Sequence, residues 1–553
     1  MSAVNQNSEV APTRRDWMAL VVFSIGLGLI VLDGTIVGVA LPVIIGDLQL
    51  NITDVNITDA QWINSLYAVL LAALLLSTGN LADRWGRKKV FLIGIVVFVA
   101  GSLLAAHSET ARVLISSRAV QALGAAFIMP STLSTVNAVF RGRYRAAAFG
   151  VWGAVISGAA AVGPFAGGAL TQWASWPWIF LVNLPIGALV FVAALFSVPN
   201  TRGKSGRPGI DVDGAMLSAI GFGALVFAII EGPDLGWWTP KGEFSIFGWN
   251  WPTTAALSPV PVALGVAVIA LALFVMWEHH REKVQRTALL RLGLFLLPTF
   301  AWGNVTAGMV AVGEFAIIFV LPLYLINALG LDIMGAGLVL AAMAVGAFLS
   351  GASARHLAAR FGAPTTVLIG LALEVIGILV LALLVSPTTP GWVIGVPLTV
   401  YGLGLGLASA QLTGTVLRDI PVQFSGQGSA TQSTVRQIGS ALGTAVAGAM
   451  LSVSLSMSLP QALEDAGLTG EEFDSIAEAT RSSAGVMIVQ LRAQGDHSVL
   501  GDQTALTVEA LTRGLSDATS WALLVASLFL VIGFVGVLRL RRASMISSGD
   551  EAG

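Results

Sequence analysis

Long apolar stretches, separated by short charged or turn-rich breaks, dominate the chain. A helix needs about 20 mainly apolar residues to cross a bilayer, and the pattern predicts fourteen such helices. Their limits are 17–42, 61–81, 89–107, 112–139, 146–170, 178–198, 212–231, 255–277, 298–328, 333–354, 364–386, 391–416, 427–456 and 519–538. We therefore expect an all-α integral membrane protein with an even number of spans.

The basic residues indicate how these spans are oriented. With the N-terminus inside the cell, 22 of the 29 Lys and Arg residues fall in cytoplasmic segments, as the positive-inside rule requires. Both termini are then cytoplasmic. The first span is too long for a signal peptide and carries Asp33, so we expect it to be retained. Because 24 of the basic residues are Arg and 5 are Lys, we expect a GC-rich bacterium and its inner (plasma) membrane.

Two longer segments are predicted to lie outside the cell. The 457–518 segment holds ten acidic and three basic residues. Within it, 461–480 and 505–517 can form short surface helices, and a solvated acidic loop is the alternative. The 232–254 segment carries aromatic side chains, which usually gather at the lipid headgroups; they are Trp237, Trp238, Phe244, Phe247, Trp249 and Trp251.

An internal repeat divides the spans into six, two and six. The run Gly79–Arg87 has a weaker copy at 355–363, and each copy follows the second span of a half. Repeated halves with a site between them are typical of secondary transporters. The predicted units are a cytoplasmic N-terminus, a six-helix bundle, an inserted helix pair with its linkers, a second six-helix bundle that includes 457–518, and a cytoplasmic tail. Their limits are 1–16, 17–198, 199–291, 292–540 and 541–553.

Composition excludes several classes of protein. The chain is 55% hydrophobic and 11% charged, with a mean hydropathy of +0.82, which excludes an ordinary soluble domain. It has no cysteine and five scattered histidines, so we expect neither a metal site nor a cofactor. A net charge of -2 does not indicate the basic surface that nucleic-acid binding requires.

Two other functional classes lack their motifs. The run Gly203-Lys204-Ser205 has Val198 where the first glycine of a phosphate-binding loop belongs, which argues against an ATP-driven pump. A membrane-embedded enzyme would need paired catalytic side chains near a membrane interface, and the sequence shows no such pair.

Two motifs point to one family. The loop Gly79–Lys89 resembles the cytoplasmic signature of the major facilitator superfamily, and Gly158–Gly168 resembles the antiporter motif of its drug exporters. The resemblance implies conformational gating by residues of both motifs, which rock two halves against each other. These residues are Gly79, Asp83, Arg84, Gly86, Arg87, Gly163, Pro164, Gly167 and Gly168.

Further runs narrow the resemblance to the fourteen-helix drug:proton antiporters, the EmrB/QacA drug-resistance transporter family. Leu32–Pro42 is similar to that family's first-helix motif, Arg118–Gly124 to the superfamily's fourth-helix arginine motif, and Trp176–Gly187 to another family block. The resemblance implies the major facilitator fold with pseudo-symmetric halves. It also implies a monomeric, proton-coupled multidrug efflux antiporter that confers antibiotic resistance by exporting hydrophobic, cationic compounds. A dedicated exporter of one metabolite, antibiotic or lipid on the same fold is the alternative.

Ionisable residues inside the spans are the candidate site, because a charge in hydrocarbon needs a cavity or a partner. At about 1.5 Å per residue, Asp33 lies roughly 13 Å and Arg118 roughly 9 Å from the outer surface, so the two can pair. Glu314 has nearly the depth of Asp33 in the corresponding span of the other half, and Glu374 is a third intramembrane acid. Proton coupling is expected at Asp33, Glu314 and Glu374, and substrate binding at Asp33, Arg118, Gln121 and Glu314.

Each of these side chains also has a structural interpretation. Asp33 can be a permanently ionised partner that only holds Arg118, and Glu314 a buried acid that stays neutral. Glu374 falls in a span whose counterpart is peripheral in the fold that the chain resembles. Arg436 is expected to tie the cytoplasmic ends of helices together rather than to touch substrate.

Asp83 gives the first testable prediction. Its charge is expected to stabilise one of two alternating states through a helix end or an arginine. Asp83→Asn should therefore leave abundance in the membrane unchanged while it strongly reduces efflux. Efflux and surface abundance are measured on the same cells, and wild-type efflux at equal abundance would reduce Asp83 to a topological signal.

Overall fold

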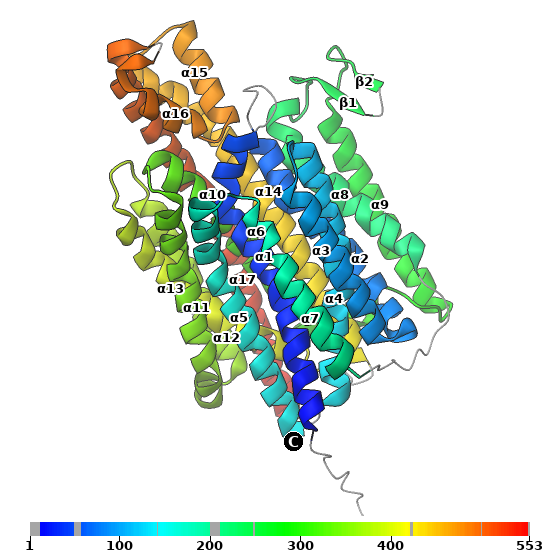
Figure 1. Ribbon diagram of the computed structural model, residues 1–553. Coiled ribbons are helices and arrows are strands. Elements are labelled where there is room, and N and C mark those ends of the chain that lie inside the picture. Colours follow the sequence, from blue (N-terminus) through cyan, green and yellow to red (C-terminus); the bar gives the residue numbers. More distant parts are fainter. Residues whose placement is uncertain are drawn as a thin grey trace, which may run out of the picture.

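The computed structural model describes residues 12–48, 57–140, 142–199, 211–246, 249–420, 424–498 and 500–550, and it is almost entirely helical. Two six-span bundles are joined by an inserted helix pair (Figure 1). The first bundle contains α1 (Arg14–Leu48), α2 (Ile57–Trp85), α3 (Arg87–Ala106), α4 (Ala111–Val139), α5 (Gly142–Trp173), the short α6 (Trp178–Leu181) and α7 (Asn183–Ser197).

The inserted pair and the second bundle follow. The insertion contains α8 (Val212–Leu235), a hairpin of β1 (Phe244–Ile246) and β2 (Trp249–Trp251), and α9 (Pro259–Lys283). The second bundle begins with a short 3-10 turn, η1 (Leu292–Leu296), and α10 (Pro298–Leu323), which continues into one π-helical turn, η2 (Tyr324–Ala328). It goes on with α11 (Ile333–Phe361), α12 (Ala363–Leu384), α13 (Gly391–Val416), α14 (Ser425–Asp465), α15 (Glu471–Ser482), α16 (Val486–Gln494), the short turns η4 (Gly495–His497) and η5 (Gly501–Gln503), and α17 (Thr504–Asp550).

The predicted all-α membrane architecture is confirmed. Within the described residues, twelve helices are long and apolar enough to cross a membrane. The two remaining predicted spans, 61–81 and 146–170, fall on α2 and α5, which are 29 and 32 residues long. Both termini of the helical body lie at one end of the molecule, and α15, α16 and the β-hairpin lie at the other (Figure 1). An even number of crossings requires this arrangement.

The structure distinguishes the two alternatives predicted for the 457–518 segment. A solvated loop is wrong for its described part, because α14 continues to Asp465 and two further helices, α15 and α16, follow. The expected helix at 505–517 is the first part of the 47-residue α17. Helix α15 forms because Phe473, Ala477 and Thr480 bury one face while acidic residues occupy its first turn, where the helix dipole favours negative charge.

Small residues of the antiporter motif bring the halves together through α5. A Cβ atom on Gly163 would lie 1.9 Å from the Thr35 hydroxyl of α1. One on Gly168 would lie 3.0 Å from the carbonyl oxygen of Ile333 on α11. The absence of a side chain at these positions lets α5 pack closely against α1 of its own half and against α11 of the other half.

The inserted pair covers the opposite seam between the halves. Val226 and Ile230 of α8 pack in one apolar cluster with residues of both α2 and α14. Helix α9 packs on α8 and shows most of its apolar surface on the outside of the bundle, as expected for a helix that faces lipid. Helix α8 therefore bridges the two halves.

Cysteine labelling tests the predicted orientation of this body. The chain contains no cysteine, and Ser475 on α15 and His356 on α11 are both exposed. A membrane-impermeant maleimide should label Ser475→Cys in intact cells and His356→Cys only after lysis. The reverse pattern would place the termini outside the cell.

Candidate substrate and proton site

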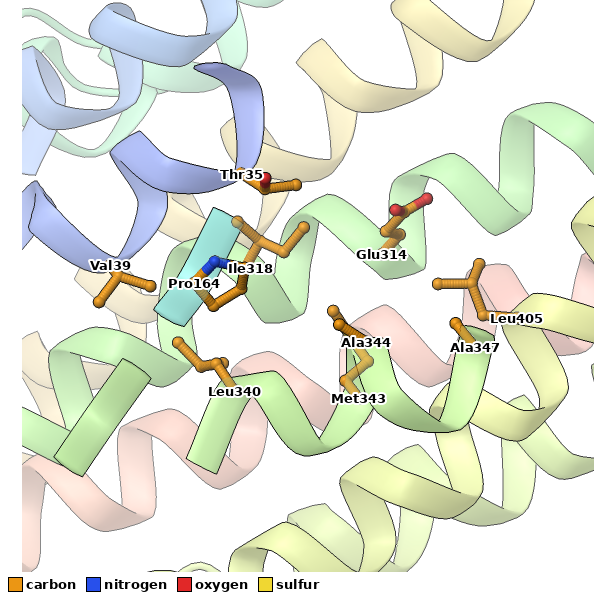
Figure 2. Close-up of a pocket in the computed structure, with 10 residues that line it drawn as sticks. All are labelled: Thr35, Val39, Pro164, Glu314, Ile318, Leu340, Met343, Ala344, Ala347 and Leu405. Carbon is orange, nitrogen blue, oxygen red and sulfur yellow. The ribbon is translucent and has the colours of Figure 1, made fainter. Parts of the chain in front are cut away.

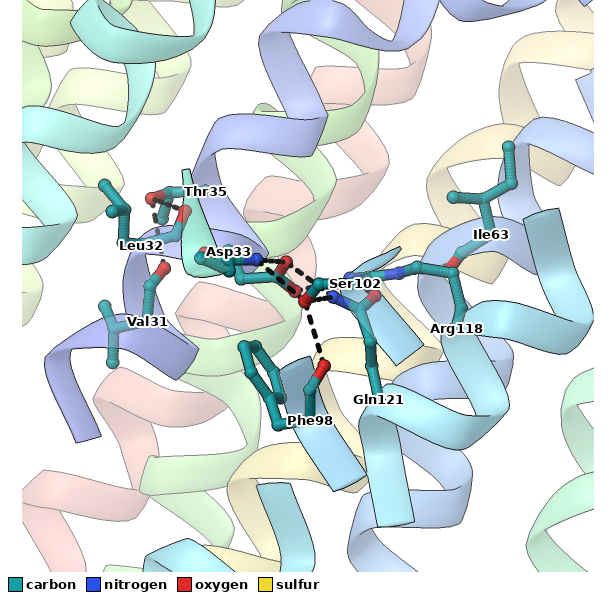
Figure 3. Close-up of polar contacts among 10 residues, drawn as sticks. Val31, Leu32, Asp33, Thr35, Ile63, Phe98, Ser102, Arg118 and Gln121 are labelled. Carbon is teal, nitrogen blue, oxygen red and sulfur yellow. Dashed lines mark hydrogen bonds and ion pairs between the residues drawn. The ribbon is translucent and has the colours of Figure 1, made fainter. Parts of the chain in front are cut away.

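Asp33 lies at the centre of a buried polar network in the first bundle (Figure 3). Its Oδ2 accepts a short hydrogen bond from Nη1 of Arg118 on α4. Its Oδ1 accepts hydrogen bonds from Nε2 of Gln121 at 3.0 Å and from Nδ2 of Asn183 at 2.9 Å. The predicted Asp33–Arg118 pair is present, and both oxygens of the carboxylate are satisfied.

A second layer of contacts holds the arginine and the two amides. Arg118 also donates to Oε1 of Gln121 at 2.8 Å, and its guanidinium lies 4.2 Å from the centre of the Tyr67 ring. The hydroxyl of Ser102 accepts hydrogen bonds from Gln121 at 2.8 Å and from Asn183 at 3.2 Å. In this conformation Gln121 is buried, and its amide is engaged by Asp33, Arg118 and Ser102.

Close packing of α3 against α4 places these groups. A Cβ atom on Gly101 would lie 2.6 Å from the backbone nitrogen of Gln121, and one on Gly124 would lie 2.3 Å from the backbone nitrogen of Phe98. The two glycines therefore allow the backbones to approach until Ser102 reaches Gln121. Packing of α3 against α4 therefore places Gln121, a residue of the fourth-helix motif, next to Ser102.

A small pocket lies between the two halves and is lined on the side of α1 by Thr35 and Val39 (Figure 2). Its volume is about 30 Å³, and its lining is apolar except for Thr35 and Glu314. The other lining residues are Val39, Pro164, Ile318, Leu340, Met343, Ala344, Ala347 and Leu405. This volume holds about one or two waters, whereas a drug-sized ligand needs about 300 Å³ or more. The site is therefore closed in this conformation.

Glu314 and Glu374 have few polar contacts. An oxygen of Glu314 lies 3.8 Å from Nη2 of Arg436, and the Arg436 side chain is 41% exposed, so this pair is loose. Glu374 on α12 is fully buried, and neither of its carboxyl oxygens has a hydrogen-bond partner among the described residues. It lies against Gly404 of α13 and does not line the pocket.

Arg436 is not where the sequence placed it. It was expected to join the cytoplasmic ends of helices, but it faces Glu314 in the middle of α10. Glu314 is the more buried of the two side chains, at 14% exposed, so Arg436 supplies it with a partly solvated counter-charge.

The family follows from comparison with known proteins. The family profile of the Major Facilitator Superfamily matches residues 23–444. The chain belongs to this superfamily. It is 32% identical over 422 residues to the methylenomycin A resistance protein of Bacillus subtilis. That alignment covers 76% of this chain and 84% of that protein. It is 30% identical over 430 residues to the multidrug resistance protein Stp of Mycobacterium tuberculosis, covering 78% and 74%.

A solved structure supports the fold. A bacterial homolog of the human lysosomal transporter Spinster, in an inward-facing and occupied conformation, aligns with a TM-score of 0.57 at 16% identity. The alignment covers 96% of this chain and 98% of that one. The superfamily, the fold and the drug-resistance branch predicted from the motifs are confirmed, and the protein is a multi-pass membrane transporter rather than an enzyme.

The loop motif of the transporter joins α2 to α3 in a tight turn. Gly86 has a φ of 106°, which favours glycine, and a Cβ atom on Gly79 would lie 3.4 Å from the Pro130 ring of α4. Arg87 is buried, and Arg84 is half-buried. The side chain of Asp83 lies outside the described residues. The turn fits the predicted motif, and gating by these residues stays a prediction.

Asn183, Ser102 and Tyr67 are the members of the transporter's network that the sequence did not single out as site residues. Uncharged polar side chains also occur elsewhere in these spans, such as Ser65 and Thr78 on α2. The local sequence therefore does not distinguish these three residues, although Asn183 belongs to the Trp176–Gly187 run.

The buried pair predicts a stability effect. Asp33→Asn leaves Arg118 buried without a counter-charge, which should reduce the free energy of unfolding by about 3–5 kcal/mol. The double variant Asp33→Asn/Arg118→Gln should recover much of the loss because it removes both charges. Thermal unfolding of the purified transporter measures this, and a single variant as stable as the wild type would show that Arg118 has another counter-charge.

Proposed function

We propose that this transporter is a proton-coupled multidrug efflux antiporter of the plasma membrane, with both termini in the cytoplasm. It exports hydrophobic, cationic compounds in exchange for protons and works as a monomer without a cofactor. The observation that carries the proposal is the pair of carboxylates at similar depths of α1 and α10, Asp33 and Glu314. Glu314 lines the closed pocket between the halves, and Asp33 lies two residues before Thr35, which also lines it.

Asp33 can couple protons because its partners come from several helices. In the present state Arg118, Gln121 and Asn183 stabilise its charged form. A movement that separates α1 from α4 would remove the guanidinium from Asp33. We propose that Asp33 takes up a proton when Arg118 leaves and releases it when Arg118 returns. A proton gradient can drive transport only if the two states differ in this way.

Glu314 suits the recognition of an apolar cation. Its carboxylate is the acidic group of an apolar pocket, and its contact with Arg436 is long. A bound cation can take the place of that arginine, and the surrounding aliphatic side chains remove apolar surface from water. Because the pocket is small in this state, substrate must enter after the halves separate. The glycines and Pro164 of the antiporter motif allow this movement between α5, α1 and α11.

Glu374 is proposed as a third proton acceptor. It is buried without a hydrogen-bond partner among the described residues, and an ionised carboxylate in such surroundings is costly. A proton that leaves Glu314 can be held there without contact with substrate. Because Glu374 does not line the pocket, its proposed role is separate from substrate binding.

The alternative of a dedicated exporter has one supporting observation. The Bacillus subtilis relative is named for resistance to a single antibiotic, methylenomycin A. The Mycobacterium tuberculosis relative is named for multidrug resistance. A pocket lined mainly by apolar residues with one acid has few directional contacts to select a single compound. These features favour a broad substrate range.

Drug-induced proton release tests the proposed coupling. A monovalent cationic drug is added to purified transporter in weak buffer while pH is recorded. Asp33→Asn should abolish the release of protons, and Asp33→Glu should keep part of it, because only the latter retains an ionisable group. Size-exclusion chromatography confirms that each variant is folded. Undiminished release from Asp33→Asn would transfer coupling to Glu314 or Glu374.

Glu314→Gln should have a different effect. Because the variant removes the negative charge from the pocket, we expect efflux of divalent cationic drugs to be lost first and that of monovalent drugs to persist. Efflux of a matched pair of monovalent and divalent dyes in the same cells measures the change. Equal loss for both dyes would contradict a charge-recognition role.

A further inference from the structure

The inserted helix α8 carries two acidic residues at the end of the molecule where α15 and α16 lie (Figure 1). Oε1 of Glu231 accepts a hydrogen bond from Nε1 of Trp62 at 2.9 Å, and Oδ2 of Asp234 accepts one from the Thr58 hydroxyl at 2.6 Å. Trp62 and Thr58 both belong to α2. These contacts fasten the end of α8 to the first half.

The other oxygen of Asp234 contacts the second half. Oδ1 of Asp234 lies 3.1 Å from Nη1 of Arg481 on α15. The same nitrogen donates to the Ser452 hydroxyl of α14 at 2.8 Å. Asp234 therefore connects α2 to α14 and α15, and its two oxygens serve different halves of the transporter.

Helices α15 and α16 are firmly part of the second half. Asn327 of η2 donates to the carbonyl oxygen of Ala484 at 2.9 Å, and Arg492 of α16 donates to that of Ala328 at 3.0 Å. A movement of the second half must therefore carry Arg481 with it.

Arg481 keeps its positive charge beside Asp234. Its hydrogen bond to Glu478 on the same helix raises the pKa of the guanidinium, burial lowers it, and the negative charges of Glu478 and Asp234 raise it further. The Arg481 and Asp234 side chains are 16% and 23% exposed. The pair is thus partly shielded from water, so salt screens it less than a surface pair.

We propose that Asp234 and Arg481 form an outer lock through which the inserted helix holds the two halves together at their external end. The lock is closed in this structure and must open before substrate can leave to the outside. The inserted pair lies outside the twelve spans of the two repeated halves. The proposed lock gives this pair a role in gating. This inference rests on the proposed alternating access of the two halves.

External labelling of a buried reporter tests the lock without any drug. Leu340 lines the pocket and is buried, so Leu340→Cys in the cysteine-free chain reports opening from outside. In this background, Asp234→Asn and Arg481→Gln should each raise the rate of labelling by an impermeant thiol reagent about fivefold, which corresponds to about 1 kcal/mol at 1.4 kcal/mol per factor of ten. The charge reversal Asp234→Arg/Arg481→Asp should bring the rate back toward the starting value.

Two further variants make the result specific. Thr58→Val removes the hydrogen bond to the first half but keeps the ion pair, so it should also raise the labelling rate. Glu509→Gln is the matched control, because its ion pair with Arg513 at 3.7 Å lies within α17 alone, and the rate should stay unchanged. Unchanged labelling in Asp234→Asn and Arg481→Gln, or an equal rise in Glu509→Gln, would overturn the lock.

The labelling result is independent of the proposed function. If drugs release no protons from the unmodified transporter while the lock variants label faster, the lock stands and the proposed coupling fails. If drug-induced proton release is intact while labelling does not change, the coupling stands and the lock fails.

Discussion

The ion pair between Asp33 and Arg118 constrains the whole first half of the transporter. Two charges removed from water cost several kcal/mol each unless hydrogen bonds replace their hydration. Here α1 supplies the acid, α4 the arginine and Gln121, α3 the Ser102 hydroxyl and α7 the Asn183 amide. Four helices must hold their relative positions for the pair to be tolerated. Separating the pair therefore changes both the packing of the bundle and the charge that Asp33 can keep.

The buried acidic residues of the two halves differ in their polar contacts, although the halves share a repeated sequence pattern. Asp33 has a complete set of partners, whereas Glu314 has one distant arginine and Glu374 has no hydrogen-bond partner among the described residues. The first half thus stabilises a charge, and the second leaves room for a proton or a cation. The pocket lies between them, where a rocking movement changes its size. Contacts of α8 and α15 at the outer end limit that movement.

Sequence patterns predicted much of this arrangement, and tertiary packing determined the rest. Helix limits follow from apolar length, and the Asp33–Arg118 pair follows from depth along two spans. The partner of Arg436 was missed, because depth alone does not give the direction in which a side chain points. Helix α15 was only partly foreseen, since its acidic composition also fits a loop and its buried Phe473 gains a partner only in the folded bundle. The link from Asp234 to Arg481 joins residues 247 positions apart, which local patterns cannot show.

The central claim is that Asp33 exchanges Arg118 for a proton when the transporter changes state. Infrared difference spectroscopy observes this directly, because only a protonated carboxyl group gives its C=O stretching band. Adding a cationic drug to the purified transporter at constant pH should remove such a band, and the change should be absent in Asp33→Asn and shifted in frequency in Asp33→Glu. The same band change in Asp33→Asn as in the wild type would show that Asp33 stays ionised throughout and serves only to hold Arg118.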